Sequence, residues 1–376
     1  MLEKVGFKNF LALRDVELTL EPFTVIVGPN ASGKSSILEG IRRIVGLRGV
    51  PVDFLGVEFR PQAQNLIIQE MQSLESKNLQ PLPISFSYKF ENSDDFQIDF
   101  SQVSHNYSLK INGLSVRREL EVRDAHNFPV ISKMTSKIIT FSRNDAARAS
   151  YSENLSPVLE PTGLGLATIC SYTQSLQPEK FAWIQAKMRE IIPNFQKFRI
   201  EPARVAAKDW FNVTDPEQLL EDILARRFGT GQQLLFDFEK SSNVAVKFVS
   251  EGTLFALTVL VTVAISQNDT VILIDDIERG LHPKAVKDLI RVLREIQAIT
   301  SGLQIIATSH SPYVLHELEP KEVRVTTFDP ELGTLVAPLE AYPNFEQWRE
   351  SMTPGEFWSF VGEDWVKELF LEKARA

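Results

Sequence analysis

The sequence predicts an α/β fold with a mainly parallel core sheet, an inserted antiparallel β-meander and a helical subdomain. Three observations predict it. The chain opens with a strand, a glycine-rich loop and a helix, and the last two elements of this order end by residue 47. Residues 82–124 alternate apolar and polar side chains, the pattern of half-buried antiparallel strands. The last third of the chain alternates strands with helices, which is the order of a parallel sheet with crossover helices.

The composition excludes several classes of protein. Of the 376 residues, 43% are hydrophobic, which is enough for the core of one large or two ordinary domains. A net charge of −9 argues against a protein that coats nucleic acid over its whole surface, although a local basic face is compatible with it. The single cysteine, Cys170, allows no intramolecular disulfide. The charged N-terminus has no secretory segment, and the apolar run 253–266 is too short to span a membrane. We therefore expect a cytoplasmic protein.

Local patterns predict each element in chain order. Residues 1–27 contain three short strands, and residues 35–47 place isoleucine and leucine at helical spacing. Within the β-meander, Asn112-Gly113 is a hairpin signal. The later elements are expected to be mainly helix over 153–228, strands over 232–249, a helix over 253–266, a strand over 271–275, a helix over 284–298 and a strand over 303–309.

Changes of pattern divide the chain into five expected parts. Residues 1–80 form an N-terminal lobe, and residues 81–125 form the antiparallel β insertion. A mainly helical subdomain over 126–240 precedes a C-terminal lobe over 241–340. Residues 341–376 form an aromatic-rich tail, in which tryptophans are more often packing residues than a stacking platform.

The loop after the third strand carries a phosphate-binding motif. GPNASGKSS satisfies G-x-x-x-x-G-K-[ST] between a predicted strand and a predicted helix. Its backbone N–H groups curl around phosphate oxygens, and the helix N-terminus adds partial positive charge. Lys34 would neutralise the β- and γ-phosphates of ATP, and Ser35 would bind Mg²⁺. The predicted nucleotide-binding residues of this loop are Gly28, Pro29, Asn30, Ala31, Ser32, Gly33, Lys34, Ser35 and Ser36.

Two adjacent aspartates follow the aliphatic run VILI. Like charges at the end of a buried strand repel each other and lose solvation, and a cation beside them offsets both costs. Asp275 is therefore the second predicted Mg²⁺ ligand, in the position that an aspartate occupies in P-loop nucleotidases. Asp276 is predicted to position or deprotonate the attacking water. The alternative for Asp276 is an ordinary solvated turn residue.

Two further segments with candidate site residues lie in the sequence before and after the aspartates. VSEGTL, with Ser250 and Gly252, precedes an apolar helix, and His310 follows another buried strand. A histidine at a strand end beside a nucleotide can hydrogen-bond the γ-phosphate. Taken alone, His310 is more often a structural histidine.

The order of these motifs resembles the ABC-type ATPase heads of the SMC, RecF and OLD proteins. The P-loop, S-x-G before a helix, hhhhDD, ERGLHP and TSHSP follow one another as in those heads, and the set is similar in particular to OLD-like ATPases, among them standalone partners in bacterial anti-phage systems. The resemblance implies a head-to-tail homodimer. Ser250 and Gly252 of one protomer would cap the γ-phosphate bound by Lys34 of the other, and His310 would be the switch histidine.

The sequence departs from the family pattern at the aspartate pair and at the VSEGTL segment. Asp276 stands where the family usually has glutamate, so hydrolysis is either slow or uses Glu278. Glu251 places a negative charge near the phosphate and would weaken dimer closure. Candidates for the glutamine loop lie before or within SRNDAARA (142–149), and the spacing selects none of them.

The resemblance implies an ATPase that hydrolyses ATP to ADP and phosphate and regulates a separate effector. Too few residues follow His310 for a Toprim nuclease domain, so we expect a Toprim-like or other nuclease as a separate protein in anti-phage defence. Two other classes stay open: a nucleotide-gated scaffold with little turnover, and a RecF-like DNA-maintenance ATPase. Binding of nucleic acid would use the basic spots at Arg117, Arg118, Arg123, Arg226 and Arg227, although charged residues on exposed strands are also ordinary.

Overall fold

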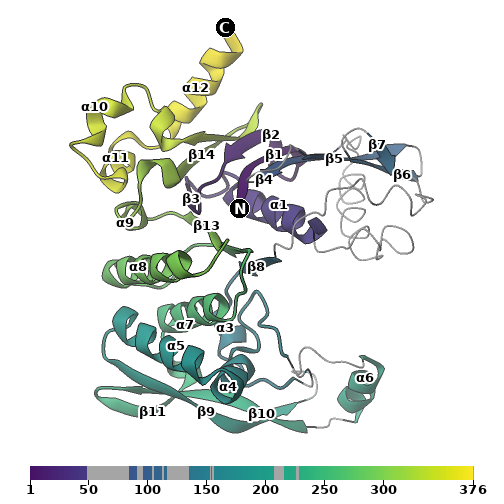
Figure 1. Ribbon diagram of the computed structural model, residues 1–376, viewed down its shortest axis with the longest axis vertical. Helices are drawn as coiled ribbons and strands as arrows, with labels where there is room; N and C mark the ends of the chain where they lie inside the picture. The colour runs from purple at the N-terminus through teal and green to yellow at the C-terminus, as the bar shows by residue number, and fades with distance from the viewer. Residues whose placement is uncertain are drawn as a thin grey trace. The chain divides into compact units, whose positions relative to one another are not determined.

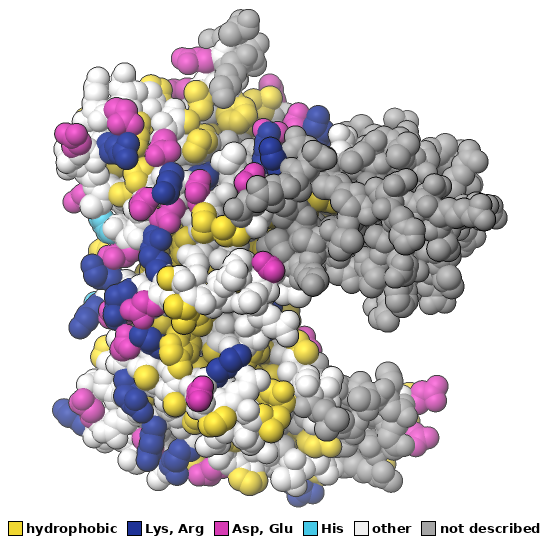
Figure 2. Space-filling view, in the orientation of Figure 1, with side chains coloured by type: hydrophobic (Ala, Val, Ile, Leu, Met, Phe, Trp, Pro, Cys, Tyr) yellow, Lys and Arg dark blue, Asp and Glu magenta, His cyan; other side chains and the backbone are white. Residues whose placement is uncertain are grey.

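The computed structural model describes residues 1–48, 84–90, 96–103, 106–111, 114–116, 135–152, 154, 156–206, 216–225 and 228–375. The chain forms two compact units (Figure 1). Unit 1 comprises Met1–Ser136, Asn268–Leu273 and Ser301–Ala376, and unit 2 comprises Lys137–Gln267 and Ile274–Thr300. The predicted turn at Asn112-Gly113 and the five arginines considered for nucleic acid lie outside the described residues. On the described part of one face, Figure 2 shows acidic and basic side chains intermixed.

Unit 1 contains a six-stranded antiparallel sheet, in the order β2-β1-β4-β5-β6-β7. Val5 and Phe7 are buried from β1, and Phe7 pairs with Val16 on one side and with Phe86 on the other. The predicted β insertion therefore extends the sheet begun by the first two strands. The strands are β1 (Leu2–Phe10), β2 (Leu13–Thr19), β4 (Ile84–Phe90), β5 (Phe96–Val103), β6 (Asn106–Ile111) and β7 (Leu114–Val116).

A second six-stranded sheet, in the order β15-β14-β3-β13-β12-β8, follows the buried aliphatic runs. Every residue of β3, β12 and β13 is buried, as expected of central strands covered on both faces. β3 pairs in parallel with β13 and β14, while β14 and β15 form an antiparallel edge hairpin, which confirms the mainly parallel sheet. The strands are β3 (Phe23–Val27), β8 (Thr135–Ile139), β12 (Thr270–Ile274), β13 (Gln304–Ser309), β14 (Val323–Asp329) and β15 (Gly333–Pro338).

Helices complete unit 1. Helix α1 (Lys34–Arg48) packs on β1 and β13. The aromatic-rich tail packs through edge-to-face rings, since Tyr342 lies 5.0 Å from Phe357 and 5.5 Å from Trp365 between ring centroids. Trp365 is buried, as expected of a packing residue. The helices of this C-terminal part are α9 (Pro312–Leu315), α10 (Phe345–Arg349), α11 (Pro354–Val361) and α12 (Asp364–Arg375).

Unit 2 combines helices with an antiparallel sheet, in the order β11-β10-β9. The expectation of mainly helix over 153–228 is wrong for residues 195–206, which form β9. Phe195 and Phe198 suggest helical spacing, but both are buried beside Phe236 of β10. Pro202 is tolerated because β9 is an edge strand. The elements are α3 (Arg143–Ala146), α4 (Leu166–Leu176), α5 (Pro178–Ile191), β9 (Phe195–Ala206), α6 (Pro216–Leu224), β10 (Phe228–Phe238), β11 (Ser241–Ala245), α7 (Glu251–Ala264) and α8 (Pro283–Ile299).

Helix α7 is the centre of unit 2. All its residues from Gly252 to Ala264 are buried, so the apolar run is a core helix, as predicted. Helix α5 packs on it and also on α8. Among the described helices, none is both long and apolar enough to cross a membrane.

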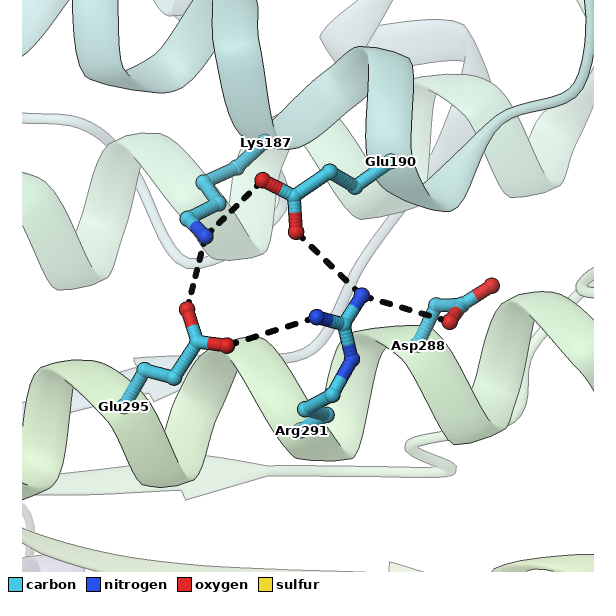
Figure 3. A network of polar contacts seen from close by, with 5 residues as sticks. All are labelled: Lys187, Glu190, Asp288, Arg291 and Glu295. Carbon is cyan, nitrogen blue, oxygen red and sulfur yellow. Dashed lines mark hydrogen bonds and ion pairs between the residues drawn. The ribbon is translucent and has the colours of Figure 1, made fainter.

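Charged side chains join α5 to α8 (Figure 3). Lys187 of α5 lies 2.9 Å from Glu190 and 2.6 Å from Glu295 of α8, while Arg291 of α8 lies 3.2 Å from Glu190 and 3.4 Å from Asp288. The hydrogen bond from Lys187 is the largest cause that lowers the pKa of Glu295. Because the Lys187 side chain is only 15% exposed, this network orients α8 more firmly than isolated surface pairs do.

An ion pair fixes α12 to the hairpin and predicts a pH-dependent stability. Asp329 lies 2.6 Å from Lys367, and this hydrogen bond, with those from Leu332 and Glu331 N–H, lowers the pKa of Asp329 to about 2. Because this value is below the ordinary value near 3.9, the stabilisation is complete above about pH 4 and is lost as the pH falls through about 2. Thermal unfolding of Asp329→Asn and wild type should therefore differ most above pH 4 and converge towards pH 2. A difference independent of pH would contradict this.

Candidate nucleotide-binding site

The ends of β3 and β13 lie beside the middle of β14 in the parallel sheet of unit 1. Val27 of β3 pairs with Ser309 of β13 and with Val325 of β14. The residues that follow these three positions are Gly28, His310 and Thr326. The register therefore brings the predicted phosphate loop and the predicted switch histidine together, although some 280 residues separate them in the sequence.

The loop has the backbone of a phosphate-binding loop. Ala31 and Gly33 have φ values of +62° and +99°. A Cβ on Gly33 would lie 2.1 Å from Thr334 Oγ1, so this position requires glycine for both conformation and space. Pro29, Asn30 and Ala31 are exposed, as is Ser35 in the first turn of α1. Since that turn holds no acidic residue, the helix N-terminus favours an anion.

Lys34 is held against its own loop. Its side chain is buried, and Nζ donates hydrogen bonds to Gly28 O at 2.9 Å and to Pro29 O at 2.8 Å. Ser32 is also buried, whereas Ser36 is half-buried and His310 is exposed. A buried ammonium within this loop is placed to meet phosphate oxygens.

Two threonines behind the loop were not predicted from the sequence. Thr326 Oγ1 donates a hydrogen bond to Val27 O at 3.0 Å and lies 2.7 Å from Ser32 Oγ. Thr334 is fully buried against Gly33, and its Oγ1 has no hydrogen-bond partner among the described residues. Threonine is ordinary in a strand, so only the position of the β14–β15 hairpin reveals these contacts.

The two aspartates lie in unit 2, directly after β12. Asp275 N–H donates a hydrogen bond to Ile139 O at 3.0 Å, and both aspartates are half-buried. Asp276 has a left-handed backbone, with φ +56°, and its Oδ2 lies 3.2 Å from Arg279 Nη2. Arg279 also donates a hydrogen bond to Phe141 O at 2.6 Å. Arg279, to which the sequence assigned no role, therefore restrains the Asp276 side chain.

The predicted signature segment begins α7 in the same unit. Ser250 is the exposed N-cap, and its Oγ accepts a hydrogen bond from Thr253 N–H at 3.3 Å. Gly252 lies against the ERGLHP loop, since a Cβ on it would approach Gly280 O to 2.1 Å. Unit 2 thus brings the signature segment beside the loop that follows Asp276 and the half-buried Glu278.

The segment SRNDAARA supports the signature loop. Arg143 Nη2 donates hydrogen bonds to Lys247 O at 2.7 Å and to Val249 O at 3.2 Å, directly before Ser250. Ser142 caps α3 through its side chain. The sequence marked this segment only as a region for the glutamine loop, and the arginine–carbonyl contacts depend on the fold.

Known proteins share this fold or are similar to parts of this sequence. One is the crystal structure of an Smc head bound to the C-winged helix domain of ScpA, with a TM-score of 0.52 at 16% sequence identity. The match covers 90% of this chain and 98% of that one. The OLD nuclease of Thermus scotoductus is 42% identical over 65 residues, and RecF of Synechococcus is 25% identical over 167 residues. These matches cover 15% and 44% of this chain, which spans only 12% and 39% of the length of the two relatives.

The chain therefore has the fold of an SMC head, and its sequence is similar to OLD, Smc and RecF proteins. The family model described as "AAA domain, putative AbiEii toxin, Type IV TA system" matches residues 50–316, and a second model, "AAA domain", matches residues 4–54. The chain belongs to the first of these families.

The two threonines give a matched test of the contacts behind the loop. Thr334→Val replaces a buried, unpaired hydroxyl with a methyl group, so we expect the free energy of unfolding to rise by about 1 kcal/mol. Thr326→Val removes two hydrogen bonds and leaves buried Ser32 without one partner, so we expect a loss of about 1–3 kcal/mol. Denaturant unfolding measures both. Changes of the same sign would show that the contacts are wrongly assigned.

The contact between Gly252 and Gly280 predicts a steric effect. Gly252→Ala forces the two loops apart, so we expect the free energy of unfolding to fall by about 1–3 kcal/mol. Glu251→Ala, one residue earlier and exposed, keeps its Cβ and should change stability by less than about 0.5 kcal/mol. Denaturant unfolding compares the two variants, and equal effects would rule out the close approach as the cause.

Proposed function

We propose that this protein binds Mg²⁺-ATP at the loop Gly28–Ser36, hydrolyses it to ADP and phosphate, and uses the nucleotide to control a separate effector. The observation that supports this most directly is the register of Val27 with Ser309 and Val325, which puts the loop and His310 at one sheet edge. The family of AAA domains to which the chain belongs supports the same class of activity.

To bind the phosphates, Lys34 of the loop would give up its hydrogen bonds to backbone carbonyls for bonds to phosphate oxygens. The N–H groups at the start of α1 bind the anion, and the Lys34 ammonium leaves the carbonyls of Gly28 and Pro29 for β- and γ-phosphate oxygens. Ser35 and Asp275 would hold Mg²⁺, which neutralises charge that develops on the phosphate oxygens. Among the described residues no group of three or more His, Cys, Asp or Glu forms a metal cage, which suits an ion bound largely by phosphate and water.

Hydrolysis would then follow the in-line course of phosphoryl transfer. The oxygen of a water molecule attacks the γ-phosphorus while the bond to the β–γ bridging oxygen breaks, and ADP leaves. Asp276 positions this water and accepts its proton, and His310 hydrogen-bonds the γ-phosphate. Glu278 is the alternative acid, because it lies in the same turn.

The nucleotide would also join two copies of the chain. Exposed Ser250, at the N-terminus of α7, and Gly252 would cap the γ-phosphate bound by Lys34 of a second protomer, so that a two-fold homodimer encloses two nucleotides. Glu251 in the first turn places a negative charge near the phosphate and would weaken this closure.

The effector would be a separate protein, in the first place a Toprim-like or other nuclease in bacterial anti-phage defence. The match to the OLD nuclease supports a nuclease, and the SMC head bound to a domain of ScpA shows that a head of this fold can bind another protein. The protein itself would act in the cytoplasm.

A scaffold that binds ATP with little turnover is the second candidate. It is favoured by the ion pair of Asp276 with Arg279, which occupies the carboxylate that would position water. The Asp276 side chain is one methylene shorter than that of glutamate, which also favours a scaffold with little turnover.

Solution mass and phosphate release test the proposal together. We expect light scattering to detect an ATP-dependent dimer of wild type, a more persistent dimer of Asp276→Asn, and none of Lys34→Ala. Phosphate release by Asp276→Asn should fall about 100-fold or more, because it lacks the general base. A mass that never responds to Mg²⁺-ATP, with unchanged turnover by Asp276→Asn, would contradict the dimer and the role of Asp276.

Removal of the Asp276–Arg279 ion pair distinguishes the ATPase from the scaffold with little turnover. If the protein is an ATPase restrained by Arg279, Arg279→Met should raise turnover several-fold. A single burst of phosphate with no further turnover, in wild type and in this variant alike, identifies the scaffold.

A further inference from the structure

The C-terminal segment 353–367, which contains α11 and the start of α12, contacts two elements that adjoin the candidate nucleotide-binding site, the β14–β15 hairpin and α9. We propose that this segment is a positioning element, which holds the phosphate loop through the β14–β15 hairpin and the His310 loop through α9. This inference rests on the proposed nucleotide site. Figure 1 shows α11 beside α9 and α12 beside β14, and these pairs are in contact.

The first contact reaches the phosphate loop. Lys367 of α12 lies 2.6 Å from Asp329, which ends β14 and also accepts the N–H groups of the turn that follows. Three residues earlier, Thr326 lies 2.7 Å from Ser32 of the loop, and on β15 buried Thr334 touches Gly33. The hairpin is thus held by α12 at its tip and packs on the phosphate loop along its length.

The second contact reaches the His310 loop. Helix α9 begins at Pro312, two residues after His310. A Cβ on Gly355 would lie 2.3 Å from Pro312 O, so the backbone of α11 lies directly on α9. His316, after α9, lies 2.6 Å from Thr353 Oγ1 through its Nδ1.

The two contacts belong to one rigid piece of chain. Thr353 and Glu356 form a complete capping box, which fixes the start of α11. Trp365 Nε1 donates a hydrogen bond to Gly362 O at 3.1 Å across the bend between α11 and α12. The Trp365 ring packs on Tyr342, which in turn packs on Phe357 of α11. Displacement of either helix would therefore move the other.

The bend itself lies within electrostatic range of Lys34. Burial, with Asp364 in support, raises the pKa of Glu363, and the Lys34 ammonium acts in the opposite direction. The carboxylate thus experiences the field of the residue that would bind phosphate. This agrees with a segment that spans from one side of the site to the other.

A purely structural role would change stability without a selective effect on catalysis. Lys367→Met removes the ion pair and keeps most of the aliphatic stem, whereas His316→Phe removes Nδ1 and keeps a ring. Lys367→Arg and His316→Asn retain a donor or acceptor and serve as rescues. Arg349→Met is the control, because it breaks the exposed ion pair with Glu346 in α10 and touches neither contact.

Steady-state kinetics with Mg²⁺-ATP at 25 °C should separate the two contacts. We expect Lys367→Met to raise KM about threefold to tenfold with kcat nearly unchanged, and His316→Phe to lower kcat by a similar factor with KM nearly unchanged. Both rescues and the control should resemble wild type. Equal kinetics for all variants, or equal loss in the control, would overturn the proposal.

Amide hydrogen exchange without nucleotide tests the positioning independently of ATPase activity. Lys367→Met should speed exchange in residues 28–36, and His316→Phe should speed it in residues 310–316. If wild type neither binds nor hydrolyses ATP but these exchange changes appear, the proposed function fails while the positioning holds. If exchange in both segments is unchanged, the positioning fails whatever the activity.

Discussion

The parallel pairing of β3 with β13 and β14 is the constraint on which the candidate nucleotide site of unit 1 depends. Val27 pairs with both Ser309 and Val325, so the residues that follow them, which are the first residue of the phosphate loop, His310 and Thr326, lie at one level of the sheet. A slip of one residue would turn buried side chains to the opposite face and move the loops out of line. Full burial of β3 and β13 penalises any such slip, so the apolar core fixes the geometry of a polar site.

Close backbone approach is the second constraint, and it recurs in both units. Gly33 admits Thr334 behind the phosphate loop, and Gly252 admits Gly280 at the start of α7. In each case the absence of a glycine side chain lets a segment from elsewhere in the sequence come close. Any Cβ at these positions would push apart segments that the proposed chemistry requires together. The two glycines are therefore required for lack of room as well as for backbone conformation.

Much of the fold follows from local sequence patterns, and much of the site does not. Buried runs such as FTVIV and VILI identify central strands, and the motif around Lys34 identifies its loop without any tertiary information. The same reasoning does not predict β9, because the spacing of Phe195 and Phe198 is also that of a helix. Pairing with β10 makes this segment a strand. Thr326, Thr334 and Arg279 are ordinary residues in sequence. Their contacts arise from register and loop position, which a single sequence does not encode locally.

The turn after β12 offers a physical reason for aspartate at position 276. The backbone there is left-handed, a conformation that aspartate tolerates better than glutamate because its short carboxylate can satisfy nearby groups. Arg279, three residues later, supplies such a group at 3.2 Å and is itself held by Phe141 O. A longer side chain at 276 would reach past this guanidinium. The same turn that accommodates a shorter acid therefore also restrains its carboxylate, through the ion pair with Arg279.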